Sequence, residues 1–361
     1  MGALAGLLVE LGHEVSGSDV AFDPPIGPAL QQWGVRCLQG YDPSHLEPAP
    51  ELVVIGNVCR SDNPEARAAI DGGLPYTHIA GALQRFALAQ CRPLVVTGTH
   101  GKTTTTSMAA WLLDAAGQRP GFLVGGIPAN FQHGFRAAKL GLPLVTRLDA
   151  DAPPSKLPPF VLEGDEYDTA FFEKSPKFVH YRAQVVILTS IEHDHIDIYP
   201  EPEQYFEAFR RLLRELPESG LVVANAGDPQ VVRLVQEAAR CEVSWYGLEG
   251  ATAGLAAHWL AAPVLEDPAG QSFDLFAGGT SVGRFRLPMT GRHNLQNAVA
   301  AIGAVAQGFG LDPRTVAQAL SGFLGVKRRQ ELRGTPGGVA VYDDFAHHPT
   351  AVRETLLALK A

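Results

Sequence analysis

A strand that leads directly into a glycine turn and a helix is the feature that most constrains this chain. The residues in order are Val95, Val96, Thr97, Gly98, Thr99, His100, Gly101, Lys102, Thr103 and Thr104. Backbone N–H groups at the beginning of a helix attract anions, and Lys102 adds a mobile positive charge. The spacing departs from the usual phosphate loop, because Val96 stands where the first glycine would be. The strand before the turn and the helix expected at 104–113 nevertheless predict a phosphate cradle for a nucleoside triphosphate, with the Thr103 hydroxyl placed to ligate Mg²⁺.

Bulk composition sets the limits of the fold and of its partners. A chain of 361 residues is too long for one ordinary core, so two or three domains are expected. Its net charge of -9 gives no general attraction to nucleic acid, so anionic ligands must be held in local cationic pockets. The four cysteines, which lie far apart, predict reduced thiols and a cytoplasmic location. Residues 1–11 are apolar but too short and too poor in basic residues for a signal peptide or a membrane span.

The first 90 residues alternate between strand-like and helical segments. Strands are expected at 13–19, 52–55 and 76–79, and helices at 1–11, 64–71 and 82–90. This alternation predicts a parallel α/β sheet that binds a nucleotide, with its first strand and glycine-rich turn missing. We therefore expect the chain to begin inside a domain, which we place at residues 1–90.

The α/β pattern begins again at Pro93 and defines a second unit, residues 91–328. Strands are expected at Phe160–Glu163, Val185–Ser190 and Leu221–Asn225, a β-rich stretch at 259–287, a helix at 295–309, and a surface excursion rich in Pro, Asp, Ala and Ser between Leu142 and Pro159. A strand at Val339–Asp343 would open a third α/β domain, residues 329–361, too short to bury its own core.

Carboxylates gather where the strand Phe160–Glu163 ends. Glu163, Asp165, Glu166 and Asp168 follow one another within six residues. Ligands collect at the carboxyl ends of parallel strands, and Mg²⁺ prefers hard oxygen ligands, so Glu163 is a candidate metal ligand. A solvated acidic turn is the alternative interpretation.

Histidines and acids follow the next strand, in the order Glu192, His193, Asp194, His195, Ile196 and Asp197. This pattern favours metal binding. It also resembles the His-x-His-x-Asp-His run of binuclear metallohydrolases, but Ile198 stands in the place of the last histidine. A packed or surface role for either histidine stays open.

Two polar clusters near the C-terminal end complete the set of candidates. His293, Asn294 and Asn297 lie on adjacent turns of one predicted helix, where amides can read both edges of adenine. Helix capping by Asn294 is the alternative. The basic run 327–329 contains arginines that suit terminal phosphates, although such a run alone is usually a solvated face.

Taken in order, these motifs resemble the Mur ligase family. The matching segments are 98–104, 163–166, 194–197, 291–297, 328–329 and the run Asp343-Asp344-Phe345-Ala346-His347-His348-Pro349. The resemblance implies an α/β chain with a Rossmann-like, UDP-sugar-binding N-terminal domain, a central P-loop ATPase domain and the start of a truncated C-terminal ligase domain. It also implies an ATP-dependent, ADP-forming ligase that makes an amide through an acyl phosphate.

Within the family, segments 167–181 and 331–334 look most like the peptidoglycan-recycling branch. That branch joins UDP-N-acetylmuramate to L-alanyl-γ-D-glutamyl-meso-diaminopimelate. A sibling that adds L-alanine alone is the alternative, and a metallohydrolase or a non-catalytic nucleotide-binding fragment is a distant one. The C-terminal domain of the family closes over ATP, so this stretch alone is expected to have little ligase activity.

The resemblance also implies roles for single residues. Lys102, His195 and Arg329 would be catalytic; Thr103 and Glu163 would hold one Mg²⁺ and His195 a second. The remaining contacts to ATP are expected from Gly98, Thr99, His100, Gly101, Lys102, Thr103, Thr104, His293, Asn294, Asn297, Arg329 and Asp344. Among these, Asn294 and Asn297 would face adenine and Asp344 the ribose.

Overall fold

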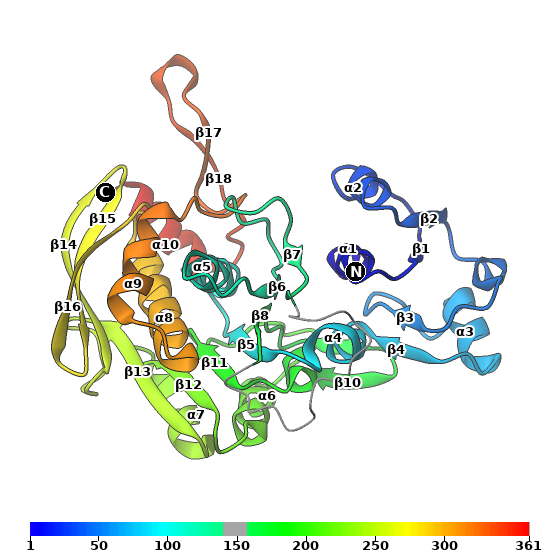
Figure 1. The fold of residues 1–361 in the computed structure, drawn as a ribbon, viewed down its shortest axis with the longest axis horizontal. Coiled ribbons are helices and arrows are strands. Elements are labelled where there is room, and N and C mark those ends of the chain that lie inside the picture. Colours follow the sequence, from blue (N-terminus) through cyan, green and yellow to red (C-terminus); the bar gives the residue numbers. More distant parts are fainter. Residues whose placement is uncertain (140–156, 361) are drawn as a thin grey trace.

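The computed structural model, which describes residues 1–139 and 157–360, is built around one ten-stranded mixed sheet (Figure 1). Its strands lie in the order β16-β15-β14-β13-β12-β11-β5-β8-β6-β7. From β14 to β6 all neighbours are parallel, whereas β15, β16 and β7 pair antiparallel. The strands are β5 (Arg92–Thr97), β6 (Gly121–Leu123), β7 (Phe135–Arg136), β8 (Pro159–Glu163), β11 (Val185–Leu188), β12 (Leu221–Asn225), β13 (Glu242–Leu248), β14 (Trp259–Asp267), β15 (Gly270–Ala277) and β16 (Thr280–Leu287).

Helices cover both faces of this sheet, and the apolar residues of its strands alternate between two cores. In β5, Leu94 and Val96 belong to the core under α5 and α8, whereas Val95 belongs to the core that contains α6 and α7. Strands buried on both faces explain the continuous apolar runs of the sequence. The helices here are α5 (Lys102–Ala115), α6 (Pro202–Glu215), α7 (Pro229–Ala238), α8 (Arg292–Phe309) and α9 (Pro313–Gln318), with the 3-10 helix η5 (Ala319–Gly322).

The first 90 residues form two separate pairs of parallel strands rather than one joined sheet. Strand β1 pairs with β2 and β3 with β4, and these elements lie at one side of the molecule (Figure 1). The sequence analysis predicted neither α2 nor β2. Strand β2 is short, and two of its four residues are exposed, so it lacks the apolar run of a buried strand. The elements are α1 (Gly2–Glu10), β1 (Ser16–Asp19), α2 (Ile26–Gln32), β2 (Arg36–Gln39), η1 (Pro43–Leu46), β3 (Val53–Ile55), α3 (Pro64–Asp71), β4 (Tyr76–His78), α4 (Ile79–Leu83) and the π-helical η2 (Gln84–Leu88).

A hairpin and a helix follow the central sheet. Strands β17 (Glu331–Gly334) and β18 (Val341–Asp343) pair antiparallel around η6 (Pro336–Gly338), and the hairpin projects from the body of the molecule (Figure 1). The strand predicted at Val339–Asp343 is therefore present, followed by α10 (Pro349–Lys360). A second hairpin, β9 (Asp168–Ala170) with β10 (Glu173–Pro176), precedes η4 (Lys177–Tyr181). The excursion predicted between Leu142 and Pro159 falls outside the described residues as far as position 156.

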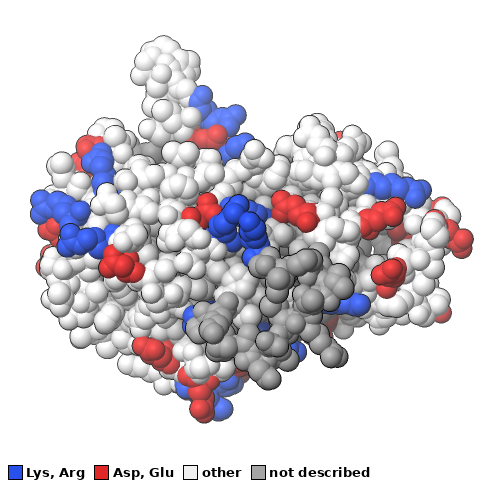
Figure 2. Space-filling view, viewed as in Figure 1, with Lys and Arg blue, Asp and Glu red and all other residues white. Residues whose placement is uncertain are grey.

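The α/β fold class is confirmed, with a Rossmann-like first part and a central domain that carries the phosphate-loop topology. All four cysteines are free thiols. Within residues 1–139 and 157–360, no helix combines the length and the hydrophobicity that crossing a membrane requires. On the face shown in Figure 2, acidic and basic side chains are interspersed in small groups over the part drawn in colour and white.

Candidate functional site

Glycines shape the loop between β5 and α5. Gly98 has φ +128° and Gly101 has φ +79°, both in the left-handed region that side chains rarely adopt. A Cβ on Gly98 would lie 2.3 Å from Thr189 Oγ1, and one on Gly101 would lie 2.5 Å from Asn297 Oδ1. The loop therefore packs closely against both the end of β11 and helix α8, and only glycine fits these two positions.

Hydrogen bonds fasten the same loop to the segment that follows β11. The Thr189 hydroxyl donates to the His100 carbonyl at 2.6 Å, and the Thr99 N–H donates to the Ser190 carbonyl at 2.8 Å. The Thr99 hydroxyl also donates to the Glu192 carbonyl at 2.8 Å. The position of the loop is thus fixed relative to residues 189–195.

Helix α5 begins at Lys102, and its N-cap residue, Gly101, supplies no side-chain hydrogen bond. The first backbone N–H groups of a helix have no partner within the helix, and together with the helix dipole they attract negative charge. Lys102, Thr103 and Thr104 occupy this first turn. The predicted phosphate cradle therefore has the expected geometry: a strand, a tight glycine loop and an uncapped helix N-terminus.

The Lys102 ammonium lies inside its own loop and pairs with a buried carboxylate. Its Nζ is 2.7 Å from the Gly98 carbonyl and 3.2 Å from Glu166 Oε2. Glu166, whose side chain is 0% exposed, also binds His195 Nε2 through Oε1 at 2.9 Å. One carboxylate therefore joins two of the three residues that the sequence analysis named as catalytic.

The pKa values of these three groups favour their charged forms. Burial disfavours the ammonium, but the carboxylates, Glu166 first, outweigh it and raise the pKa of Lys102. Burial likewise opposes ionisation of Glu166, but Lys102 and the His195 hydrogen bond lower its pKa. The hydrogen bond that His195 donates to Glu166 raises the pKa of His195. Mutual stabilisation therefore keeps all three groups charged around the fully buried Glu166 carboxylate.

The backbone holds His195 in an uncommon conformation. Its φ is +53°, in the left-handed region that is unfavourable for residues with a Cβ. The His195 N–H donates to Asp194 Oδ1 at 2.8 Å, and its carbonyl accepts from the Tyr199 N–H at 2.8 Å. The Tyr199 hydroxyl in turn donates to the Glu166 backbone carbonyl. This turn directs the imidazole toward Glu166 and the phosphate loop.

Thr103 and Glu163 form the second contact at the loop. The Thr103 hydroxyl donates to Glu163 Oε1 at 2.8 Å, and the Gly125 N–H donates to Oε2 at 2.7 Å. Arg329 Nη2 donates to the Thr103 hydroxyl at 3.2 Å. Burial, with the nearby Asp165 next, raises the pKa of Glu163. The structure therefore brings a hydroxyl, a carboxylate and a guanidinium together beside the first turn of α5.

Each carboxylate after β8 has its own partner, so this segment is not the solvated turn considered as an alternative. Glu163 accepts from Thr103, and Glu166 binds Lys102 and His195. Asp165 pairs with the buried Lys177 at 3.1 Å, and Asp168 pairs with the exposed Lys174 at 2.8 Å. Sequence reasoning assigned a role to Glu163 alone and missed Glu166, the more central of the two. The acidic run in the sequence showed that carboxylates gather after β8. Its spacing did not show which of them would face the loop.

The start of α8 and the residues after Arg329 form a polar, hydrogen-bonded cluster. Asn294 Nδ2 donates to the Thr290 carbonyl at 2.7 Å and to Gln330 Oε1 at 3.0 Å. The Gln330 N–H donates to Asp344 Oδ2 at 2.8 Å. Asn294 does not cap α8, because the N-cap is Gly291, so that alternative is wrong. Sequence analysis missed Gln330, which links Asn294 to Asp344.

His293 and Asn297 lie beside this cluster on α8. His293 is half-buried, its buried Nδ1 has no hydrogen-bond partner among the described residues, and desolvation lowers its pKa. The Asn297 side chain faces Gly101 of the phosphate loop. Asn297 thus adjoins the loop and Arg329 contacts Thr103, whereas Asn294 and Asp344 are joined to each other through Gln330.

The histidines of the metallohydrolase alternative point to different partners. His193 Nε2 lies 2.7 Å from the Tyr199 carbonyl, whereas His195 Nε2 binds Glu166. Asp197 is exposed. Among the described residues these side chains do not gather around one point, so the geometry gives no support to a binuclear hydrolase.

Family models match two parts of the chain. The model described as "Mur ligase family, catalytic domain" matches residues 1–90, and the model described as "Mur ligase middle domain" matches residues 96–305. A UDP-N-acetylmuramate-L-alanyl-gamma-D-glutamyl-meso-2,6-diaminoheptandioate ligase from Escherichia coli K12 is 39% identical over 360 residues, which cover 100% of this chain and 73% of that protein. A UDP-N-acetylmuramate-L-alanine ligase from Roseiflexus is 36% identical, and the match covers 100% of this chain and 74% of that protein.

A solved structure of a Mur ligase is also similar to this chain. The crystal structure of a murein peptide ligase from Psychrobacter arcticus superposes with a TM-score of 0.81 at 35% identity, over 100% of this chain and 73% of that one. The chain thus spans about three quarters of the proteins it matches. Identity at this level over such a length, together with both family models, shows common descent: the chain belongs to the Mur ligase family.

Proposed function

We propose that this protein is an ATP-dependent, ADP-forming ligase that joins the lactyl carboxylate of UDP-N-acetylmuramate to the amine of L-alanyl-γ-D-glutamyl-meso-diaminopimelate. The observation that carries the proposal is the convergence of Lys102, Glu166, His195, Thr103 and Glu163 at one glycine loop. Relatives that bear this activity in their names are 39% and 35% identical over the whole chain.

The residues present fit the groups that the family uses, ATP and Mg²⁺. The loop excludes a Cβ at Gly98 and Gly101, and α5 begins without a side-chain cap, as a cradle for phosphate requires. Thr103 and Glu163 would hold one Mg²⁺ through a hydroxyl and a carboxylate, and His195 would hold a second through its imidazole. When bound, the metal would neutralise charge that develops on the phosphate oxygens.

The remaining residues would orient ATP. Lys102 would reach the β- and γ-phosphates, and Arg329 a phosphate oxygen. Asn294 and Asn297 would face adenine, and Asp344 the ribose. His293 on α8 and the remaining residues of the phosphate loop would lie around the bound nucleotide. These assignments rest on the resemblance, on the contacts of Asn297 and Arg329 with the loop and the first turn of α5, and on the link between Asn294 and Asp344 through Gln330.

The reaction needs no covalent nucleophile from the protein. The muramyl carboxylate attacks the γ-phosphorus of ATP, ADP leaves, and an acyl phosphate forms. The peptide amine then attacks the acyl carbon, phosphate leaves, and an amide results. Catalysis consists of holding the carboxylate in line with the phosphoryl group and of stabilising the negative charge with Lys102 and the metal.

The domain boundaries and the location in the cell belong to the same proposal. We place the UDP-sugar-binding domain at residues 1–90, the ATP-binding domain at 91–328 and the beginning of the ligase domain at 329–361. A location in the cytoplasm is supported by the free thiols of all four cysteines.

A product assay tests the function and the choice of amine. The complete protein is incubated with ATP, Mg²⁺, UDP-N-acetylmuramate and either the tripeptide or L-alanine, and ADP and the UDP-linked product are measured. The tripeptide is expected to give product faster; preference for L-alanine would assign the sibling activity instead. Lys102→Ala is expected to abolish ATP-dependent amide formation, and normal turnover of that variant would reject the site.

A further inference from the structure

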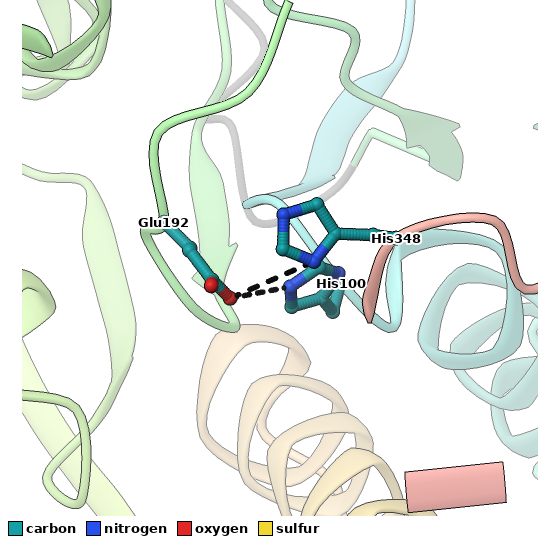
Figure 3. Close-up of side chains that lie close together, drawn as sticks. All are labelled: His100, Glu192 and His348. Carbon is teal, nitrogen blue, oxygen red and sulfur yellow. Dashed lines mark hydrogen bonds and ion pairs between the residues drawn. The ribbon is translucent and has the colours of Figure 1, made fainter. Parts of the chain in front are cut away.

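A cluster of two histidines and one glutamate joins three distant segments beside the phosphate loop (Figure 3). His100 comes from the loop itself, Glu192 from the segment after β11, and His348 from the residues just before α10. His100 Nε2 is 2.9 Å from Glu192 Oε2, and His348 Nδ1 is 3.9 Å from the same oxygen. The His-His-Pro run was noted in the sequence, but the proposed reaction gives it no role.

The ligand atoms of these three side chains all lie within 4.8 Å of one another. Two donors bound to a tetrahedral Zn²⁺ at about 2.05 Å are separated by about 3.3 Å. The observed 2.9 Å and 3.9 Å bracket that separation, so small side-chain movements bring the Glu192 oxygen and the two imidazole nitrogens to the spacing that an ion requires. In Figure 3 both imidazole rings face the Glu192 carboxylate.

The chemistry of the donors selects a class of metal. Imidazole nitrogens suit Zn²⁺ and similar transition-metal ions, whereas Mg²⁺ prefers a set of oxygens. Burial lowers the pKa of His100, which favours the neutral imidazole that a metal requires. The three side chains are 22%, 45% and 19% exposed, which leaves access for the ion and for a water as the fourth ligand.

We propose that His100, Glu192 and His348 form a binding site for Zn²⁺ or a similar transition-metal ion, distinct from the Mg²⁺ ligands Thr103, Glu163 and His195. A bound ion connects the phosphate loop to the residues that begin α10. Thr350 already donates to Glu192 Oε1 at 3.1 Å, so the ion strengthens an existing contact between the central sheet and the C-terminal segment.

Metal titration of the purified protein tests this site without any measurement of turnover, so its outcome is independent of the proposed reaction. Zn²⁺ binding is followed by calorimetry, and Co²⁺ binding by its visible absorption, both in excess Mg²⁺. We expect one Zn²⁺ per chain and an intense, tetrahedral Co²⁺ spectrum. His348→Ala should weaken binding at least tenfold. His347→Ala is the matched control, because the His347 ring faces the Phe345 carbonyl, and it should bind as the parent does.

Two further measurements keep the test decisive. Glu192→Gln should also weaken Zn²⁺ binding, and it serves as the second variant if His348→Ala fails to fold. Zn²⁺ should slow amide hydrogen exchange in α10 of the parent but not of His348→Ala. Equal Zn²⁺ affinity in His348→Ala and His347→Ala would overturn the proposal. So would binding that is lost in His195→Ala alone, because the ion would then occupy the Mg²⁺ ligands.

Discussion

Replacing Glu166 by glutamine should destabilise the central domain far more than replacing Asp168, in the same acidic run, by asparagine. The substitution preserves the size of the side chain but removes the charge shared by Lys102 and His195. A glutamine amide accepts a hydrogen bond through its oxygen only, so its nitrogen meets one of the two donors. In either orientation the amide N–H₂ group faces a donor in a buried site, and the Lys102 ammonium loses its ionic partner.

The expected magnitude follows from the geometry. At 3.2 Å and an effective dielectric constant of about 20, the attraction between Lys102 and Glu166 amounts to about 5 kcal/mol. Removing one member of a buried pair typically costs about 3–5 kcal/mol of stability. The Lys102 ammonium keeps the Gly98 carbonyl at 2.7 Å, which favours the lower end, about 3 kcal/mol.

Urea denaturation followed by tryptophan fluorescence measures this loss. Asp168→Asn is the matched control from the same acidic run, because its partner Lys174 is 68% exposed and such surface pairs contribute about 0–1 kcal/mol. A Glu166→Gln variant no less stable than Asp168→Asn would refute the argument that Glu166 holds the lysine and the histidine.

Two further predictions concern the loop and the response to acid. Gly101→Ala should weaken binding of a non-hydrolysable ATP analogue at least tenfold, because the added Cβ would meet Asn297 Oδ1 at 2.5 Å. Gly117→Ala is the control: Gly117 has a similar φ of +76° but open space around it, so this variant should bind the analogue normally. Equal affinities of the two variants would contradict the steric argument. Burial, and then the neighbouring His180, lower the pKa of His78, so the unfolded chain takes up a proton more readily and stability should fall as the pH drops below about 6.5. His78→Asn, which can still cap α4, should lose less stability between about pH 7 and pH 5 in urea titrations, and an unchanged pH dependence would count against this reasoning.

The sequence predicted those parts of the fold and site that depend on local pattern. The strand, glycine turn and helix of the phosphate loop appear at 92–115 as expected, and the runs that end in Glu163 and Ser190 are β8 and β11. Both strands are hydrogen-bonded neighbours of β5, so parallel topology alone brings their carboxyl ends together. That rule needs only the order of elements, which hydrophobic patterning reveals.

Contacts set by irregular backbone could not be predicted in this way. Glu166 faces Lys102 because the chain leaves β8 after Glu163 and turns, and no periodicity describes that turn. His195 reaches the same carboxylate through a left-handed φ of +53°. Gln330, also at positive φ, lies between α8 and Asp344 only in the folded chain. In each case tertiary packing, rather than local propensity, decides the direction of the side chain.

The hydrogen bonds between the glycine loop and residues 189–192 have a consequence for affinity. A free loop would have to lose conformational entropy when an anion arrives, and that loss would subtract from the binding free energy. Here the Thr189 hydroxyl and the Ser190 carbonyl already restrain the loop. Ordering has therefore been completed during folding, and more of the attraction between loop and triphosphate remains available as net affinity.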